Sequence, residues 1–105
     1  MPDTERMQQI RALLAEDPAD PFLRYGLALE YAGQGDDQTA ATHFRDLIAA
    51  SPDYVPAYLM LGQTLVRLGH DDEAKDTLRR GVAAAARTRN EHAQGEMQVL
   101  LDSLD

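Results

Sequence analysis

The sequence predicts an all-α protein in which about six helices stack as antiparallel pairs. Apolar residues recur at intervals of three and four along nearly the whole chain, as they do on one face of a helix. No stretch alternates between apolar and polar residues, so we expect no β-sheet. The segment LALEYAGQGDDQTA, residues 27–40, returns as LGQTLVRLGHDDEA, residues 61–74, at an offset of 34 residues. This self-similarity favours a stack of repeats over a simple helical bundle.

The first predicted helix covers residues 4–17. Its apolar residues recur at helical spacing, so they share one face. They are Met7, Ile10, Leu13 and Leu14. The segment DPADP, residues 17–21, ends the helix because proline cannot continue it. We therefore expect one amphipathic helix ahead of the repeats.

Residues 20–53 are predicted to form a pair of helices. The first begins at Pro21, which suits a first turn, and ends near Gly33 and Gly35, which suit a C-terminal cap. The apolar face of the second helix consists of Phe44, Leu47 and Ile48, and the helix closes at Ser51 and Pro52. The short connection between them predicts a helix-turn-helix unit.

Residues 54–87 repeat this arrangement, and residues 90–104 form a last helix. The first helix of the second pair ends near Gly69 and is marked by Tyr58, Leu61, Gly62 and Leu65. Its partner helix is marked by Ala74, Leu78 and Val82. The last helix carries Ala93, Met97, Leu100, Leu101 and Leu104 on one side and polar residues elsewhere. Because the end of a stack exposes an apolar face, we expect this helix to cover it as a cap.

The 34-residue unit resembles the tetratricopeptide repeat, whose pattern is W-x2-L-G-x2-Y, then A-x3-F, then P. The matching residues are Leu27, Ala28, Tyr31, Ala40, Phe44 and Pro52 in the first unit, and Tyr58, Leu61, Gly62, Leu65, Ala74 and Leu78 in the second. Arg24 occupies the usual Trp position, and Ala86 replaces the second closing Pro. The pattern has small residues at Ala28, Ala40, Gly62 and Ala74, which allow the paired helices to cross closely.

The resemblance covers about residues 20–87 and implies a short right-handed solenoid of tetratricopeptide repeats. Residues 4–17 are then an N-terminal half-repeat, residues 20–53 and 54–87 are two repeats, and residues 90–104 are the cap. The tail from Gly81 onward also resembles the end of small stand-alone bacterial tetratricopeptide proteins.

Charge and composition exclude several classes of protein. The net charge of −8 comes from 18 acidic and 10 basic residues, and a nucleic-acid binder needs a basic face. The absence of cysteine excludes a disulfide, a thiolate nucleophile and a cysteine zinc site. The first ten residues lack the basic and apolar regions of a leader, and no stretch approaches the roughly 18 apolar residues of a membrane span. We therefore expect a cytoplasmic protein without nucleic-acid or membrane partners.

Each potential catalytic motif has a simpler structural interpretation. The cluster HDDE, residues 70–73, begins a predicted helix, where acidic side chains cap free amides and complement the helix dipole. GQG, residues 33–35, follows a helix and not a strand, unlike a dinucleotide-binding loop. The only serines, Ser51 and Ser103, lie outside any G-x-S-x-G motif, and His43 and His92 are predicted to be surface histidines. We expect no catalytic, metal or cofactor-binding residues and therefore no enzyme.

The resemblance implies that the first helix of each pair lines a concave side, which receives a peptide or helix of a partner protein. The first helix of the first pair has one apolar stripe for internal packing at Leu27, Ala28 and Tyr31, and a second apolar stripe beside it. The predicted groove takes this second stripe and the matching positions 34 residues later. Its residues are Phe22, Tyr25, Leu29, Leu59, Gln63, Val66 and Arg67.

Two interpretations of the second stripe stay open. In the first, it binds a segment of a partner protein, and the chain is an interaction module. In the second, the stripe is consumed by internal packing or by a second copy of the chain, giving a homo-oligomeric structural protein. A monomer or a weak homodimer is consistent with these alternatives, and one sequence does not identify the partner.

Overall fold

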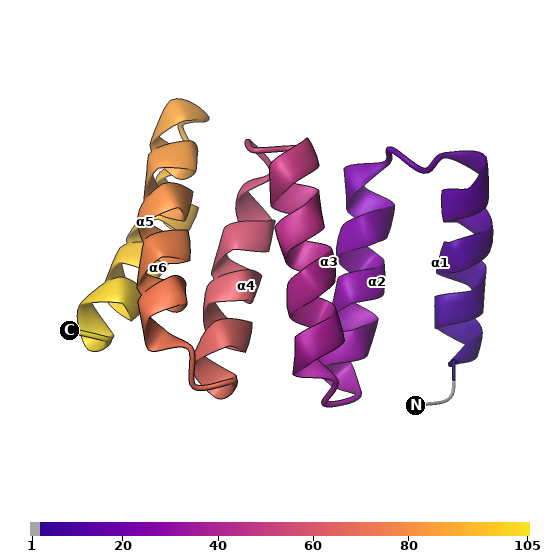
Figure 1. The fold of residues 1–105 in the computed structure, drawn as a ribbon. Coiled ribbons are helices and arrows are strands. Elements are labelled where there is room, and N and C mark those ends of the chain that lie inside the picture. Colours follow the sequence, from indigo (N-terminus) through magenta and orange to yellow (C-terminus); the bar gives the residue numbers. More distant parts are fainter. Residues whose placement is uncertain (1–2) are drawn as a thin grey trace.

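The computed structural model describes residues 3–105, which form six α-helices stacked side by side in chain order (Figure 1). The helices are α1 (Glu5–Glu16), α2 (Pro21–Gly33), α3 (Asp37–Ala50), α4 (Val55–Arg67), α5 (Asp71–Arg87) and α6 (Glu91–Ser103). Each helix packs mainly on its neighbours in the chain, and α6 also contacts α4. The first and last helices, α1 and α6, therefore lie at opposite ends of the stack. The described part contains no strand, and the predicted all-α class is confirmed.

Short polar side chains begin four of the helices. The side-chain oxygen of each capping residue accepts a hydrogen bond from a backbone N–H of the first turn. The capping residues are Thr4, Asp20, Asp36 and Asn90. The N-cap residue of α5 is His70, whose side chain makes no such bond. The acidic residues 71–73 do lie in the first turn of α5, where they complement the dipole.

The turns that end α2 and α4 have the same geometry, 34 residues apart. Gly35 and Gly69 have φ angles of 81° and 80°, which favour glycine. The following residues donate to carbonyls five positions earlier, from Asp36 N to Tyr31 O at 3.0 Å and from His70 N to Leu65 O at 2.8 Å. This is the bonding of a Schellman C-cap. The repeat seen in the sequence is therefore a repeat of backbone conformation.

A third turn of this kind, between α5 and α6, carries arginine instead of glycine. Arg89 has a φ of 59°, and the next amide bonds to Ala85 O at 2.8 Å. The left-handed conformation costs a residue with a Cβ about 1 kcal/mol more than glycine.

We expect Arg89→Gly to raise the free energy of unfolding by about 0.5–1 kcal/mol, because glycine adopts this conformation without strain. Urea denaturation followed by circular dichroism would measure the change. The control is Gly69→Arg, which places the strained residue in the matching turn and should lower stability by a similar amount. A decrease in stability for Arg89→Gly would contradict this account of the turn.

The core runs through the repeats and into α6. Its largest fully buried side chains include Phe44, Leu65, Leu78 and Met97. The small residues at predicted helix crossings, Ala28, Ala40 and Ala74, are fully buried. A Cβ at Gly62 would lie 2.7 Å from a methyl carbon of Leu78, so a side chain at this position would have to displace the buried Leu78 between α4 and α5.

The first helix packs on a smaller, separate cluster. Met7 and Ile10 are buried against Leu27 of α2. Leu13 was predicted on the same face, but its side chain is 51% exposed. The reason is that α1 stands at the end of the stack, where α2 covers only part of its apolar side.

Candidate functional site

The predicted groove residues lie on α2 and α4, but they do not line a single groove. Phe22 is 70% exposed, and Arg67 is also exposed. The remaining residues are half-buried: Tyr25, Leu29, Leu59, Gln63 and Val66. Phe22, Tyr25 and Leu29 line a depression beside α1, and Leu59 and Gln63 line another beside α6.

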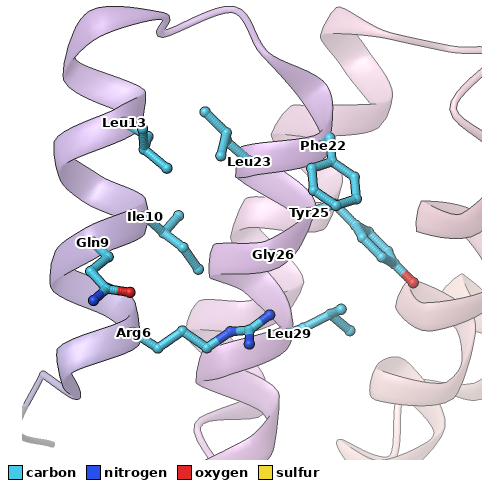
Figure 2. Close-up of a pocket in the computed structure, with 9 residues that line it drawn as sticks. All are labelled: Arg6, Gln9, Ile10, Leu13, Phe22, Leu23, Tyr25, Gly26 and Leu29. Atoms are coloured by element: carbon cyan, nitrogen blue, oxygen red, sulfur yellow. The ribbon is translucent and has the colours of Figure 1, made fainter.

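The first depression lies between α1 and α2 and has a volume of about 310 Å³. Figure 2 shows Ile10 and Leu13 pointing from α1 toward α2, with Leu23 between the two helices. Phe22 and Leu29 contribute the α2 side. The complete lining consists of Arg6, Gln9, Ile10, Leu13, Phe22, Leu23, Tyr25, Gly26 and Leu29. Arg6, its only charged residue, pairs with Glu30 at 2.7 Å. The depression is therefore an apolar surface with one cation at its edge.

Tyr25 belongs partly to this surface and partly to the interior. Its ring points away from α1 (Figure 2) and lies 5.9 Å from the ring of Phe44 and 5.5 Å from that of Tyr54, measured between centroids. This burial raises the pKa of Tyr25 above its usual value. Tyr25 thus joins α2 to α3 and to the start of α4.

The second depression lies between α4 and α6 and has a volume of about 400 Å³. Leu59 and Gln63 form its α4 side, and Val99 and Leu100 are on its α6 side. Val99 is 72% exposed and was not among the predicted site residues. The sequence contained one indication that Val99 is exposed: it is an apolar residue that lies outside the apolar face by which α6 packs.

The last two predicted residues have neighbours within the chain. Val66 is half-buried and packs against the core. The guanidinium of Arg67 lies 3.1 Å from Asp37 and donates a hydrogen bond to the Thr64 hydroxyl at 3.2 Å. Arg67 is therefore already held by its own protein, although about half of its side chain stays accessible.

His43 is not the surface histidine that was predicted. It is half-buried and stacks on Tyr31, with ring centroids 5.3 Å apart, while Arg24 lies 3.3 Å from its Nδ1. Burial, followed by the charge of Arg24, lowers the pKa of His43 below its ordinary value. His92 does lie at the surface, where it pairs with Glu96 at 2.7 Å.

The acidic cluster at the start of α5 also has a structural partner. Glu73 accepts two hydrogen bonds from Arg45, at 2.8 and 2.9 Å, and this bonding lowers the pKa of Glu73. Within residues 3–105, no group of three potential ligands gathers as a metal site. None of the helices in that range combines the length and apolar character required to cross a membrane.

Comparison with known proteins places the chain in a family. The family model described as tetratricopeptide repeat matches residues 31–95, more than half of the chain. The chain is a tetratricopeptide repeat protein. The resemblance seen in the sequence is thereby confirmed, and with it the coarse function, since these repeats are in general non-catalytic protein–protein interaction modules.

Bacterial relatives match this tetratricopeptide repeat protein over most of its length. The TPR repeat-containing protein PA0015 of Pseudomonas aeruginosa is 29% identical over 99 residues, which are 94% of each chain. The crystal structure of a tetratricopeptide repeat domain protein from Salinibacter ruber has a TM-score of 0.77 and 33% identity, covering 81% of this chain and 94% of that one. The solution structure of protein BPP2914 from Bordetella parapertussis has a TM-score of 0.82 and 28% identity, covering 97% and 89%.

Proposed function

We propose that this protein is a non-enzymatic cytoplasmic adaptor that binds a peptide or helix of a partner protein along α2, α4 and α6. The observation that carries the proposal is the location of its exposed apolar side chains. Phe22 and Val99 are more than two-thirds exposed, and each lies in a surface depression with half-buried aliphatic neighbours. Grouped apolar side chains of this kind are typical of interaction sites.

The depression between α4 and α6 is the better defined part of this surface. Leu59 and Val99 supply apolar contacts, while Gln63 and Ser103 supply hydrogen-bonding groups. A few apolar anchors beside polar groups suit the side chains and the backbone of a bound segment. The net charge of −8 favours a partner segment with basic residues.

Self-association is the second candidate. Tyr25, Leu29 and Val66 pack partly against the core, so internal packing consumes some of the stripe, as the structural interpretation requires. The adaptor proposal needs the rest of the stripe to be accessible in solution. Molar mass from light scattering separates the two, because a stable dimer that covers Leu59 and Val99 would leave no surface for a foreign partner.

We expect Leu59→Ala to weaken binding of the natural partner by about 10-fold, because apolar anchors dominate interface energies. The same change should lower the free energy of unfolding by at most about 1.5 kcal/mol, less than for a fully buried leucine. Capture from native cells would identify the partner, calorimetry would measure its affinity and urea denaturation would measure stability. Arg79→Ala, an exposed change on α5, is the control and should alter neither quantity. Unchanged partner affinity for Leu59→Ala would contradict the proposed surface.

A further inference from the structure

We propose that the depression between α1 and α2 binds an amphipathic helix of a partner protein, which lies over α1 and α2 as α2 lies over α3 and the start of α4. This inference rests on the proposed interaction function, because it names a class of partner and the site on α1 and α2 where that partner binds. A seam is the contact between the second helix of one unit and the first helix of the next, and a third helix lies over each of the other two seams.

The seam between α3 and α4 is covered by α2. The ring of Tyr25, on α2, contacts Phe44 of α3 and Tyr54 at the start of α4. The seam between α5 and α6 is covered in the same way by α4. A Cβ on Gly81 of α5 would touch both Tyr58 of α4 and Met97 of α6, so the three helices meet there. In each case the first helix of the earlier unit lies over the seam.

The seam between α1 and α2 has no such cover within residues 3–105. The 34-residue offset relates Ile10 and Leu13 of α1 to Phe44 and Leu47 of α3. Phe44 and Leu47 are 0% and 2% exposed beneath α2, whereas Leu13 is 51% exposed. Ile10 is buried, at 8% exposure, so the uncovered part of the seam is at Leu13, where no helix of the described residues takes the place that α2 holds over Leu47. The shape that fits is that of α2, a helix of 13 residues.

A second copy of the chain is a poor source for this helix. Its two end helices are α1 and α6, and their exposed residues include only one large apolar side chain each, Leu13 and Val99. The other exposed residues of α6 are mostly polar, such as Gln98, which donates to Asp102 at 2.9 Å. Two copies also each carry a charge of −8 and repel one another. A foreign helix with a full apolar face matches the seam better.

The repeat geometry gives the direction of the bound helix, and the charges at the end of α1 indicate which residues its first turn carries. The helix would run antiparallel to α1, as α2 runs relative to α3, so its first turn lies at the C-terminal end of α1. That end carries Glu16 and Asp17 and no base in its last turn. A helix N-terminus with basic side chains is favoured beside these acids. The partner is therefore an amphipathic helix with a basic first turn.

The probe is a peptide with the sequence of residues 20–33 and the substitution Gly26→Lys, locked as a helix by a lactam between the new lysine and Glu30. Locking removes the cost of ordering a free peptide. Positions 23, 26 and 30 face α1 in the intact protein, so in a docked probe they point to solvent. Titration into the isotope-labelled full-length chain should give saturable amide shifts in α1 and α2, with the largest near Leu13 and Gly26.

Matched variants locate the site. Leu13→Glu should weaken probe binding by at least about 10-fold, since it puts a charge in the apolar seam. The control is Val99→Glu, which changes a similarly exposed apolar residue at the other end of the stack. It should change the affinity for the probe by less than about 2-fold. Both positions are exposed, so neither variant threatens folding. At low salt, the probe with its natural Arg24 should bind more tightly than one with Arg24→Glu, because Arg24 of α2 lies beside Ala50 and Ser51, the equivalents of Glu16 and Asp17.

Three results would overturn the inference: no saturable shifts, shifts confined to α4 and α6, or equal binding by the Leu13→Glu protein. Equal affinity of the Arg24 and Arg24→Glu probes would refute the basic first turn. A protein that dimerises through α1, with Leu13→Glu making it monomeric, would assign the seam to a second copy instead. None of these results affects the adaptor function, because that test depends on Leu59 and the natural partner.

Discussion

Truncation after Arg89 is expected to abolish cooperative unfolding and to cause aggregation. The deletion removes α6, whose Met97 and Leu101 are 0% and 7% exposed and complete the main core. Each buried side chain of this kind is worth about 2–5 kcal/mol, and small domains have only about 5–15 kcal/mol in total. The truncated chain would also expose the apolar side of α5. Light scattering and urea denaturation of the shortened protein would measure both effects.

Deletion of residues 1–17 is the control for this truncation. It removes α1, which packs through the separate cluster of Met7, Ile10 and Leu27. We expect this protein to keep a cooperative transition at a lower denaturant concentration. The account of α6 as a cap would be wrong if the C-terminally truncated chain stayed monomeric and unfolded as sharply as the full-length protein.

Gly81→Ala is expected to lower the free energy of unfolding by about 2 kcal/mol, at the upper end of ordinary point mutations. An added Cβ would lie 2.5 Å from Met97 Sδ and 2.6 Å from Tyr58 Cβ. The sulfur can move, but the Cβ of Tyr58 is fixed to the backbone of α4, so α4 and α5 would have to separate. This strain exceeds the gain in helix propensity of about 1 kcal/mol from glycine to alanine.

Gly95→Ala provides the matched control, because Gly95 also lies inside a helix but has nothing within 4 Å of an added Cβ. Here only the propensity gain acts, and we expect stability to rise by about 0.5–1 kcal/mol. Urea denaturation of the two proteins would compare them directly. If both substitutions raised the free energy of unfolding, the steric contact at Gly81 would not outweigh the gain in helix propensity.

Local signals in the sequence predicted most of the helical architecture. Asp20, Asp36 and Asn90 cap helices through their own side chains, and Gly35 and Gly69 close them at positive φ. These effects involve only a few consecutive residues, so they can be read without knowing the fold. Arg89 could not be identified in this way, because it adopts the same turn without the glycine that marks it.

The candidate site was less predictable, because a helix with two apolar faces does not reveal which neighbour covers each one. Phe22 and Tyr25 were placed in one stripe, yet Phe22 is exposed and Tyr25 packs on Phe44. Leu13 was placed on a packed face and is half exposed. Helical spacing sets the direction of a side chain relative to its own axis. Its burial depends on helices that are distant in the sequence.

The sequence by itself determined the all-α class, the helix-turn-helix repeat and its 34-residue interval, because capping, turn geometry and amphipathic spacing are local properties. The tertiary structure alone decided that Gly81 lies where α4, α5 and α6 meet. It also decided that Leu59 and Val99 share one depression and that the seam beside Leu13 has no covering helix in the described chain. The physical reason is that burial is set by the distances between helices, and those distances follow from how the whole stack fits together.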